Sequence, residues 1–182
     1  QTTANSAAVP VRADDAYVQG NQNVTVGITG TTGGNYEALT TTSTVTTVVA
    51  DDADATAVTL SAAANATEGG SVVYTATVAN AVTGTPLVIT LTNGATITIP
   101  VGQTTANSAA VPVRADDAYI QGNQNVTVGI TSTSGGNYEA LTTTSTVTTV
   151  VADDADATAV TLSAVANATE GGSVVYTATV AN

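Results

Sequence analysis

The sequence predicts an all-β protein from three observations. Thr, Val, Ala and Gly dominate its 182 residues, and the only aromatic residue type is Tyr. Side chains branched at Cβ fit the pleated, half-buried surface of a sheet better than a helix. Apolar residues alternate with Thr and Ser in short segments between Gly, Pro and Asn, which is the pattern of strands with one buried face.

The chain repeats itself almost exactly. The segment QTTANSAAVPVRADDAY opens at residue 1 and again at residue 103, a period of 102 residues. Residues 1–80 and 103–182 differ at four pairs of positions: Val18/Ile120, Gly30/Ser132, Thr32/Ser134 and Ala63/Val165. Near-identity over a domain-sized unit predicts a longer tandem array. We divide the chain into residues 1–54, the C-terminal part of a preceding repeat; 55–156, a complete repeat; and 157–182, the N-terminal part of a following repeat.

Seven strands are expected in the complete repeat. Their residues are about 56–62, 71–78, 87–92, 95–99, 109–113, 126–130 and 145–151. The alternation places one apolar set inward, including Val58, Tyr74, Ile89, Ile97 and Val128. Seven short strands in about a hundred residues fit an immunoglobulin-like antiparallel β-sandwich.

Three positions carry more specific expectations. Asn93-Gly94 predicts a two-residue type I′ turn, in which both residues have positive φ. Pro112 has no N–H to donate, which places its strand at an edge or a bulge. Tyr119 resembles the buried corner tyrosine of such sandwiches, so we expect a structural role for it.

Composition and charge exclude several functions. The net charge is -12, which argues against binding nucleic acid or an anionic membrane surface. No apolar run is long enough for a membrane-spanning helix. His, Cys and Lys are absent, so no catalytic triad or Schiff-base lysine can be built. A glycosidase pair of Asp116 and Glu139 would place its members at opposite poles of the sandwich. We therefore expect no enzymatic activity.

The acidic residues fall at the ends of the sandwich. The predicted loops and the strand end at one pole carry Glu68, Asp116, Asp117, Asp153, Asp154 and Asp156. Glu139 faces the other pole, where the linker from the preceding repeat brings Asp51, Asp52 and Asp54. Asp14, Asp15 and Glu170 are further copies of these positions in the partial repeats.

Such a cluster needs compensation. Two like charges about 4 Å apart repel by about 4 kcal/mol near a protein surface, and Arg114 can offset only one of them. With oxygen ligands only, the expected partner is Ca²⁺, which takes six to eight oxygens. The alternative is an ordinary solvated acidic surface.

The stretches ATEGGSVVYTATV, NGATITIPVGQTTANSAAVPVRADDAY and VVADDADA resemble the immunoglobulin-like repeats of very large calcium-dependent bacterial adhesins, the type I secreted, RTX-type biofilm and ice-binding adhesins. They are more distantly similar to Calx-β domains. The resemblance implies an extender on the bacterial cell surface that holds a distant ligand-binding region away from the cell. It implies Ca²⁺ at junctions between neighbouring repeats of one chain, on the acidic residues named above.

A second reading is a self-assembling extracellular filament subunit. In that case incomplete sandwiches are completed by strands from neighbouring molecules. A continuous extender keeps each repeat self-complete, whereas strand exchange does not.

Overall fold

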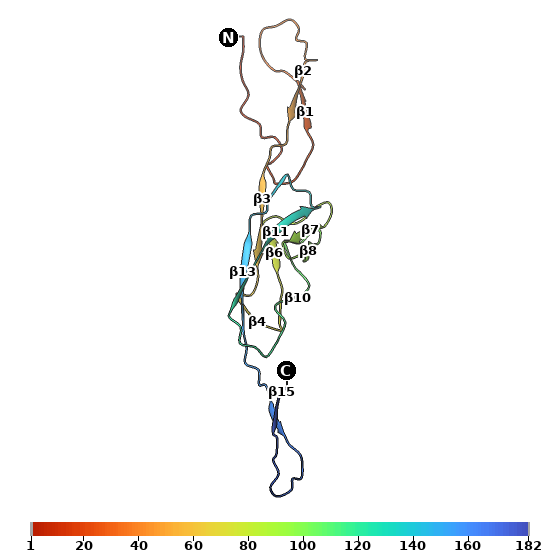
Figure 1. The fold of residues 1–182 in the computed structure, drawn as a ribbon. Coiled ribbons are helices and arrows are strands. Elements are labelled where there is room, and N and C mark those ends of the chain that lie inside the picture. The colour runs from red at the N-terminus through yellow and green to blue at the C-terminus, as the bar shows by residue number, and fades with distance from the viewer. Residues whose placement is uncertain (1, 182) are drawn as a thin grey trace.

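The alternating sequence folds into strands only. A computed structural model describes residues 2–181, and no helix occurs in that part of the chain. It follows that residues 2–181 contain no helix long and apolar enough to cross a membrane. The prediction of an all-β protein is confirmed. The molecule is drawn out along one axis, with an N-terminal hairpin near one end and a C-terminal hairpin at the other (Figure 1).

Two sheets form the middle of the molecule. One has the order β4-β13-β11-β7-β8 and the other the order β12-β3-β6-β9. The strands of the first sheet are β4 (Asn65–Thr67), β13 (Thr146–Ala152), β11 (Gln124–Ser134), β7 (Leu87–Leu91) and β8 (Thr96–Ile99). Those of the second are β12 (Ala140–Thr142), β3 (Ala55–Ser61), β6 (Thr75–Val78) and β9 (Thr105–Asn107). Pairs β12–β3 and β13–β4 are parallel, and the other pairs are antiparallel. Both sheets are therefore made from residues 55–152 alone.

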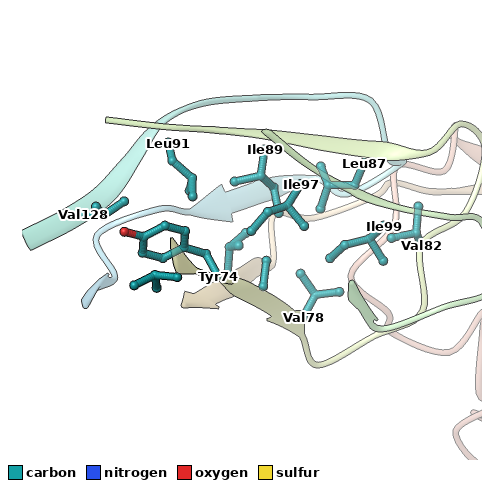
Figure 2. Packing of buried hydrophobic residues seen from close by; sticks show 12 residues of the cluster. Tyr74, Val78, Val82, Leu87, Ile89, Leu91, Ile97, Ile99 and Val128 are labelled. Atoms are coloured by element: carbon teal, nitrogen blue, oxygen red, sulfur yellow. The ribbon is translucent and has the colours of Figure 1, made fainter. Parts of the chain in front are cut away.

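The core lies between these two sheets. Ile89, Ile97 and Val128 come from the five-stranded sheet, and Val58 and Val78 from the other, and all five are almost fully buried. Figure 2 shows the side chains of the cluster pointing toward one another, with the Tyr74 ring at one end. Burying each such side chain contributes about 1.5–3 kcal/mol. This arrangement is consistent with a β-sandwich.

The second expected strand is interrupted. In place of one strand over 71–78 the structure has β5 (Ser71–Val72) and β6. Its partner is likewise split into β9 and β10 (Val111–Pro112), and β5 and β10 form a small sheet of their own. The cause is Ser108, whose Oγ accepts the Tyr74 N–H at 3.1 Å, while its own N–H donates to the Tyr74 carbonyl at 2.8 Å. The pairing shifts by one residue there, as in a β-bulge.

The turn between β7 and β8 also differs from the prediction. Gly94 has φ of 83°, but no non-glycine residue described has positive φ, so Asn93 does not. The Gly94 N–H donates to the Leu91 carbonyl at 3.0 Å and the Leu91 N–H to the Ala95 carbonyl at 2.8 Å. The predicted type I′ turn is therefore wrong, and the loop is the three-residue kind that ends on a left-handed glycine.

Tyr119 is not a buried corner residue. Its side chain is 66% exposed. The Asp117 Oδ1 accepts the Tyr119 N–H at 2.8 Å in this exposed loop. The core is already filled at its end by Tyr74, which is 2% exposed.

The flanking parts form the same hairpins as the central part, without its core. At one end β1 (Gln22–Gly27) and β2 (Thr44–Val49) pair in the register of β11 and β13. At the other end β14 (Val160–Ser163) and β15 (Thr177–Val180) pair in the register of β3 and β6. Their apolar side chains stay exposed, as at Val26 and Leu162. The same strand pairing therefore forms in all three parts of the chain, but a buried hydrophobic core forms only in the central part.

Candidate functional site

Three segments that lie far apart in the sequence are joined at the C-terminal pole of the central sandwich. The Glu68 N–H donates to the Ala152 carbonyl at 3.0 Å, and the Gly69 N–H donates to the Arg114 carbonyl at 2.8 Å. Gly69 has φ of +72°, and a Cβ there would lie 2.9 Å from the Cβ of Asp116. Only glycine allows the loop after β4 to approach this closely. The loop therefore ties the end of β13 to the loop after β10.

Three carboxylates meet where these segments join. One oxygen each of Glu68, Asp116 and Asp154 lie within 4.8 Å of one another. Glu68 is 5% exposed, and its Oε2 accepts the Arg114 Nε–H at 2.7 Å. Its Oε1 is buried and has no hydrogen-bond partner. A buried carboxylate oxygen without a partner is costly and is normally satisfied by a donor or an ion.

Two other acidic residues of this pole shape the loop instead of joining the cluster. Asp153 accepts from Arg114 Nη2 at 3.3 Å and from the Gln121 N–H at 2.8 Å. Asp117 accepts from the Tyr119 N–H and from the Gln121 side chain. Of the six acidic residues predicted for this pole, three therefore form the cluster and two support the loop, and Asp156 is the sixth.

The charge at the cluster is incompletely compensated. Asp156 lies close enough that repulsion from Asp116, and then from Asp154, raises its pKa. Burial raises the pKa of Glu68, and its hydrogen bond to Arg114 opposes that shift. Arg114 is the one cation in ion-pairing contact with this group among the described residues. When the carboxylates of the cluster are ionised, their mutual repulsion is therefore only partly offset by Arg114.

An equivalent cluster lies at the boundary between residues 1–54 and the central sandwich. Asp14, Asp52 and Asp54 bring carboxylate oxygens within 4.8 Å of one another. Repulsion from Asp52, and then from Asp54, raises the pKa of Asp14. Around this cluster Arg12 pairs with Asp51 at 2.8 Å, as Arg114 does with Asp153. Asp15 accepts the Tyr17 N–H at 2.9 Å, as Asp117 does for Tyr119.

The next unit brings a fourth carboxylate to this boundary. Glu139 Oε2 accepts the Asp54 N–H, and Glu139 Oε1 is buried without a partner. Residues 1–54 contain no copy of Glu68. Glu170, which is the copy of Glu68 in residues 157–182, is exposed and belongs to neither cluster. The structure thus places the predicted acidic residues at two boundaries, except for Glu170.

The donor set fits a hard divalent cation. Calcium binds oxygen at about 2.3–2.6 Å, so two ligands on opposite sides of one ion lie about 5 Å apart. Oxygens within 4.8 Å of one another can therefore contact a single ion. In each cluster the residues that would hold the ion are the three acids named above. In the cluster of Glu68, Asp116 and Asp154, the unpartnered Oε1 of Glu68 is available to the ion.

Sequence reasoning missed the contacts between tyrosines at the first boundary. Tyr17 and Tyr138 form an antiparallel β-bridge, and their ring centroids lie 5.6 Å apart. The signal was present in the sequence, because each unit carries one tyrosine in its DDAY segment and another in its NYE segment. Nothing in one unit alone indicates that they meet across a boundary.

Comparison with known proteins identifies a family. A family model described as the LapA domain matches residues 54–154, which is more than half of the chain. No curated protein and no solved structure matches. The expected membership in the immunoglobulin-like repeats of RTX-type adhesins is therefore wrong, because the matching family is a different one, although it is also related to adhesion.

Proposed function

The chain belongs to the LapA domain family, whose role is related to adhesion and biofilm formation at the cell surface, and on this premise we propose that it is a structural spacer whose unit boundaries are closed by Ca²⁺. In this proposal residues 55–156 are one unit of an extracellular tandem array, and residues 1–54 and 157–182 belong to its neighbours. The unit has no catalytic role, and any ligand-binding region lies elsewhere in the parent protein.

One observation carries the proposal. Glu68, Asp116 and Asp154 come from three different segments, and they converge at the point where the chain leaves the central sandwich. The buried Oε1 of Glu68 has no hydrogen-bond partner, which supports the binding of a cation at this point. An ion bound there would join the linker to two loops of the sandwich, and so would hinder the linker from bending.

The strand order supports an immunoglobulin-like unit made from one continuous chain. β3 and β6 lie in one sheet with β9 and β12, and β11 and β13 lie in the other sheet with β7, β8 and β4. Every strand of both sheets comes from residues 55–152. This favours a self-complete unit over a filament built by strand exchange.

Calcium titration tests the proposal. We expect Ca²⁺ to raise the melting temperature and to lengthen the particle in small-angle X-ray scattering, and EDTA to reverse both effects. An ion present at about 100 times its Kd stabilises the folded state by about 2.7 kcal/mol, which corresponds to about 10 °C or more for a domain of this size. If neither quantity responds to EDTA, the calcium role is wrong.

The repeat supplies a matched control. Glu68→Gln removes one negative charge from the cluster and should reduce the calcium-dependent rise in melting temperature. Glu170→Gln makes the same change in the same local sequence, ATEGG, at an exposed position outside both clusters. It should leave the response to calcium unchanged. Equal effects of the two variants would show that binding is diffuse and not at this site.

A further inference from the structure

Two tyrosines connect the first part of the chain to the central sandwich. The rings of Tyr17 and Tyr138 are tilted by 31° at a centroid separation of 5.6 Å. The Tyr17 hydroxyl donates to the Ala81 carbonyl at 2.6 Å, and the Tyr138 hydroxyl donates to the Asn80 carbonyl at 2.6 Å. Both phenols thus end on consecutive carbonyls of one loop. We call this set of contacts the tyrosine latch.

Backbone hydrogen bonds flank the latch on both sides. The Val18 N–H donates to the Asn137 carbonyl at 3.0 Å, and the Glu139 N–H donates to the Ala16 carbonyl at 3.2 Å. The Asn137 side-chain amide donates to the Val18 carbonyl at 3.1 Å. None of these contacts uses a carboxylate. The latch therefore needs no cation to form.

The same loop occurs again one period later without a partner. Tyr119 is 66% exposed and Ile120 is 101% exposed, although both are large apolar or aromatic side chains. Their copies, Tyr17 and Val18, are covered to a greater extent by the contacts of the latch. This leaves an apolar pair at the pole where the next unit begins.

The loop around Tyr119 already has its docked conformation. The Tyr119 N–H to Asp117 distance is 2.8 Å and the Tyr17 N–H to Asp15 distance is 2.9 Å. The Gln121 N–H donates to Asp153, as the Gln19 N–H does to Asp51. The Arg114 side chain donates to the Gly122 carbonyl, as the Arg12 side chain does to the Gly20 carbonyl. A preformed loop loses little conformational freedom on binding.

We propose that Tyr119 and Ile120 form the docking surface for the following repeat unit, through a second tyrosine latch. The occupant presents an Asn-Tyr-Glu loop and two consecutive carbonyls, as Asn137–Glu139 and Asn80–Ala81 do here. Residues 157–182 repeat residues 55–80, so the unit that begins there is the one that carries these elements. The inference rests on the tandem arrangement in the proposed function, but it does not depend on calcium.

Oxidative cross-linking of a lengthened chain tests this inference. A copy of residues 81–156 is appended after residue 182, so that the third unit is complete. A photoactivated ruthenium complex with persulfate removes one electron and one proton from each of two adjacent phenols, persulfate being reduced. The two rings then couple through a carbon–carbon bond to give dityrosine. The reaction is run on dilute protein, and products are located by peptide mass spectrometry, in which Val18 marks the first loop and the Tyr119→Phe variant separates the second loop from its appended copy.

The 182-residue chain should give a Tyr17–Tyr138 product and no intramolecular product at Tyr119. The lengthened chain should give an additional product between Tyr119 and the appended copy of Tyr138. Tyr119→Phe in the lengthened chain should remove only this additional product. Both products should form in calcium and in EDTA alike.

Several outcomes would overturn the inference. One is a lengthened chain that yields the Tyr17 product but none at Tyr119, and another is the absence of both. Cross-links from Tyr119 mainly between separate molecules would assign its surface to a second chain. A Tyr119 product confined to calcium would show that the latch depends on the ion. If both products form while calcium fails to lengthen the particle, the calcium proposal falls and the latch remains.

Discussion

At the scale of single residues, the main feature is that three carboxylates lie where their ionised form is unfavourable. Glu68 is buried, and one of its two oxygens has no partner. Neighbouring aspartates repel the ionised carboxylates of Asp14 and Asp156. In all three residues the pKa is raised above its ordinary value. The folded chain therefore binds protons more tightly than the unfolded chain at these sites.

We expect the metal-free protein to lose stability as the pH rises. A raised pKa in the folded state stabilises the fold below the unfolded pKa, and that contribution disappears as the pH passes through the folded pKa. For Glu68, Asp14 and Asp156 the loss begins at about pH 4. Calcium binds the ionised carboxylates, so its stabilising effect should grow over the same range.

Melting temperatures measured in EDTA and in calcium across this pH range check the expectation. Glu68→Gln removes one of the titrating groups and should flatten the profile in EDTA, whereas Glu170→Gln should not. A chelated protein that becomes more stable between about pH 4 and pH 7 would contradict the raised pKa values.

Residue-level prediction from sequence succeeded where backbone connectivity decides position. Glu68, Asp116 and Asp154 were expected at one pole because each follows a strand that ends there, and the structure brings them together. The latch could not be predicted in this way. Val18 and Asn137 lie 119 residues apart in different units, and alternation within a strand carries no information about such a contact. The turn at Asn93 failed because two loop types accept the same Asn-Gly pair.

At the scale of elements, one hairpin sequence occurs in two environments. Residues 22–27 and 124–129 are identical, as are residues 44–49 and 146–151, and both hairpins have the same register. The second hairpin packs into the core, where Val128 and Val151 are buried. In the first hairpin the copy of Val128, Val26, is 57% exposed. Burial is thus the main difference between the two hairpins.

Hydrogen exchange should separate the two copies. Amides of β11 and β13 should be protected up to the free energy of global unfolding, whereas those of β1 and β2 should open locally with a free energy near zero to a few kcal/mol. Exchange measured by NMR or by mass spectrometry on peptides from each copy provides the comparison. Equal protection of both hairpins would show that the first one is stabilised by contacts that the structure does not contain.

Strand positions were predicted well where alternation was regular, as in β7, β8 and β13. The predictions failed where a side chain replaced a backbone partner. The Ser108 hydroxyl accepts the Tyr74 N–H, and the strand expected over 71–78 is divided at this point into β5 and β6. No periodic pattern marks such a position, because Ser fits both a strand and a bulge.

At the scale of the whole molecule, a two-stranded hairpin lies at each end of the central sandwich (Figure 1). The boundary between the first part and the central sandwich has two kinds of contact, the acidic cluster and the tyrosine latch. The boundary after residue 152 has the cluster, but Tyr119 remains exposed. The two boundaries should therefore differ in stiffness.

Removing the latch should loosen only the first boundary. In EDTA, Tyr17→Ala should broaden the distribution of distances in small-angle X-ray scattering, because residues 1–54 lose the ring contact and the hydrogen bond to Ala81. Tyr119→Ala makes the same change at an exposed copy and should leave the scattering of this chain unchanged. Identical scattering from Tyr17→Ala and the unmodified protein would argue against the latch in solution.

The short linker of residues 50–54 has a further consequence for folding. Because residues 22–27 and 44–49 are identical to 124–129 and 146–151, β1 and β2 could replace the paired parts of β11 and β13 in the sandwich. In that exchange Val49 would take the place of Val151, which pairs with Ala66. β3 alone covers about 20 Å between Ala55 and Ser61, and β4, which contains Ala66, lies farther on toward the C-terminal end (Figure 1), whereas the linker from Val49 to Ala55 reaches at most about 20 Å. The linker is thus too short for a unit to take a strand from the one before it, and neighbouring copies are kept from misassembling within one chain.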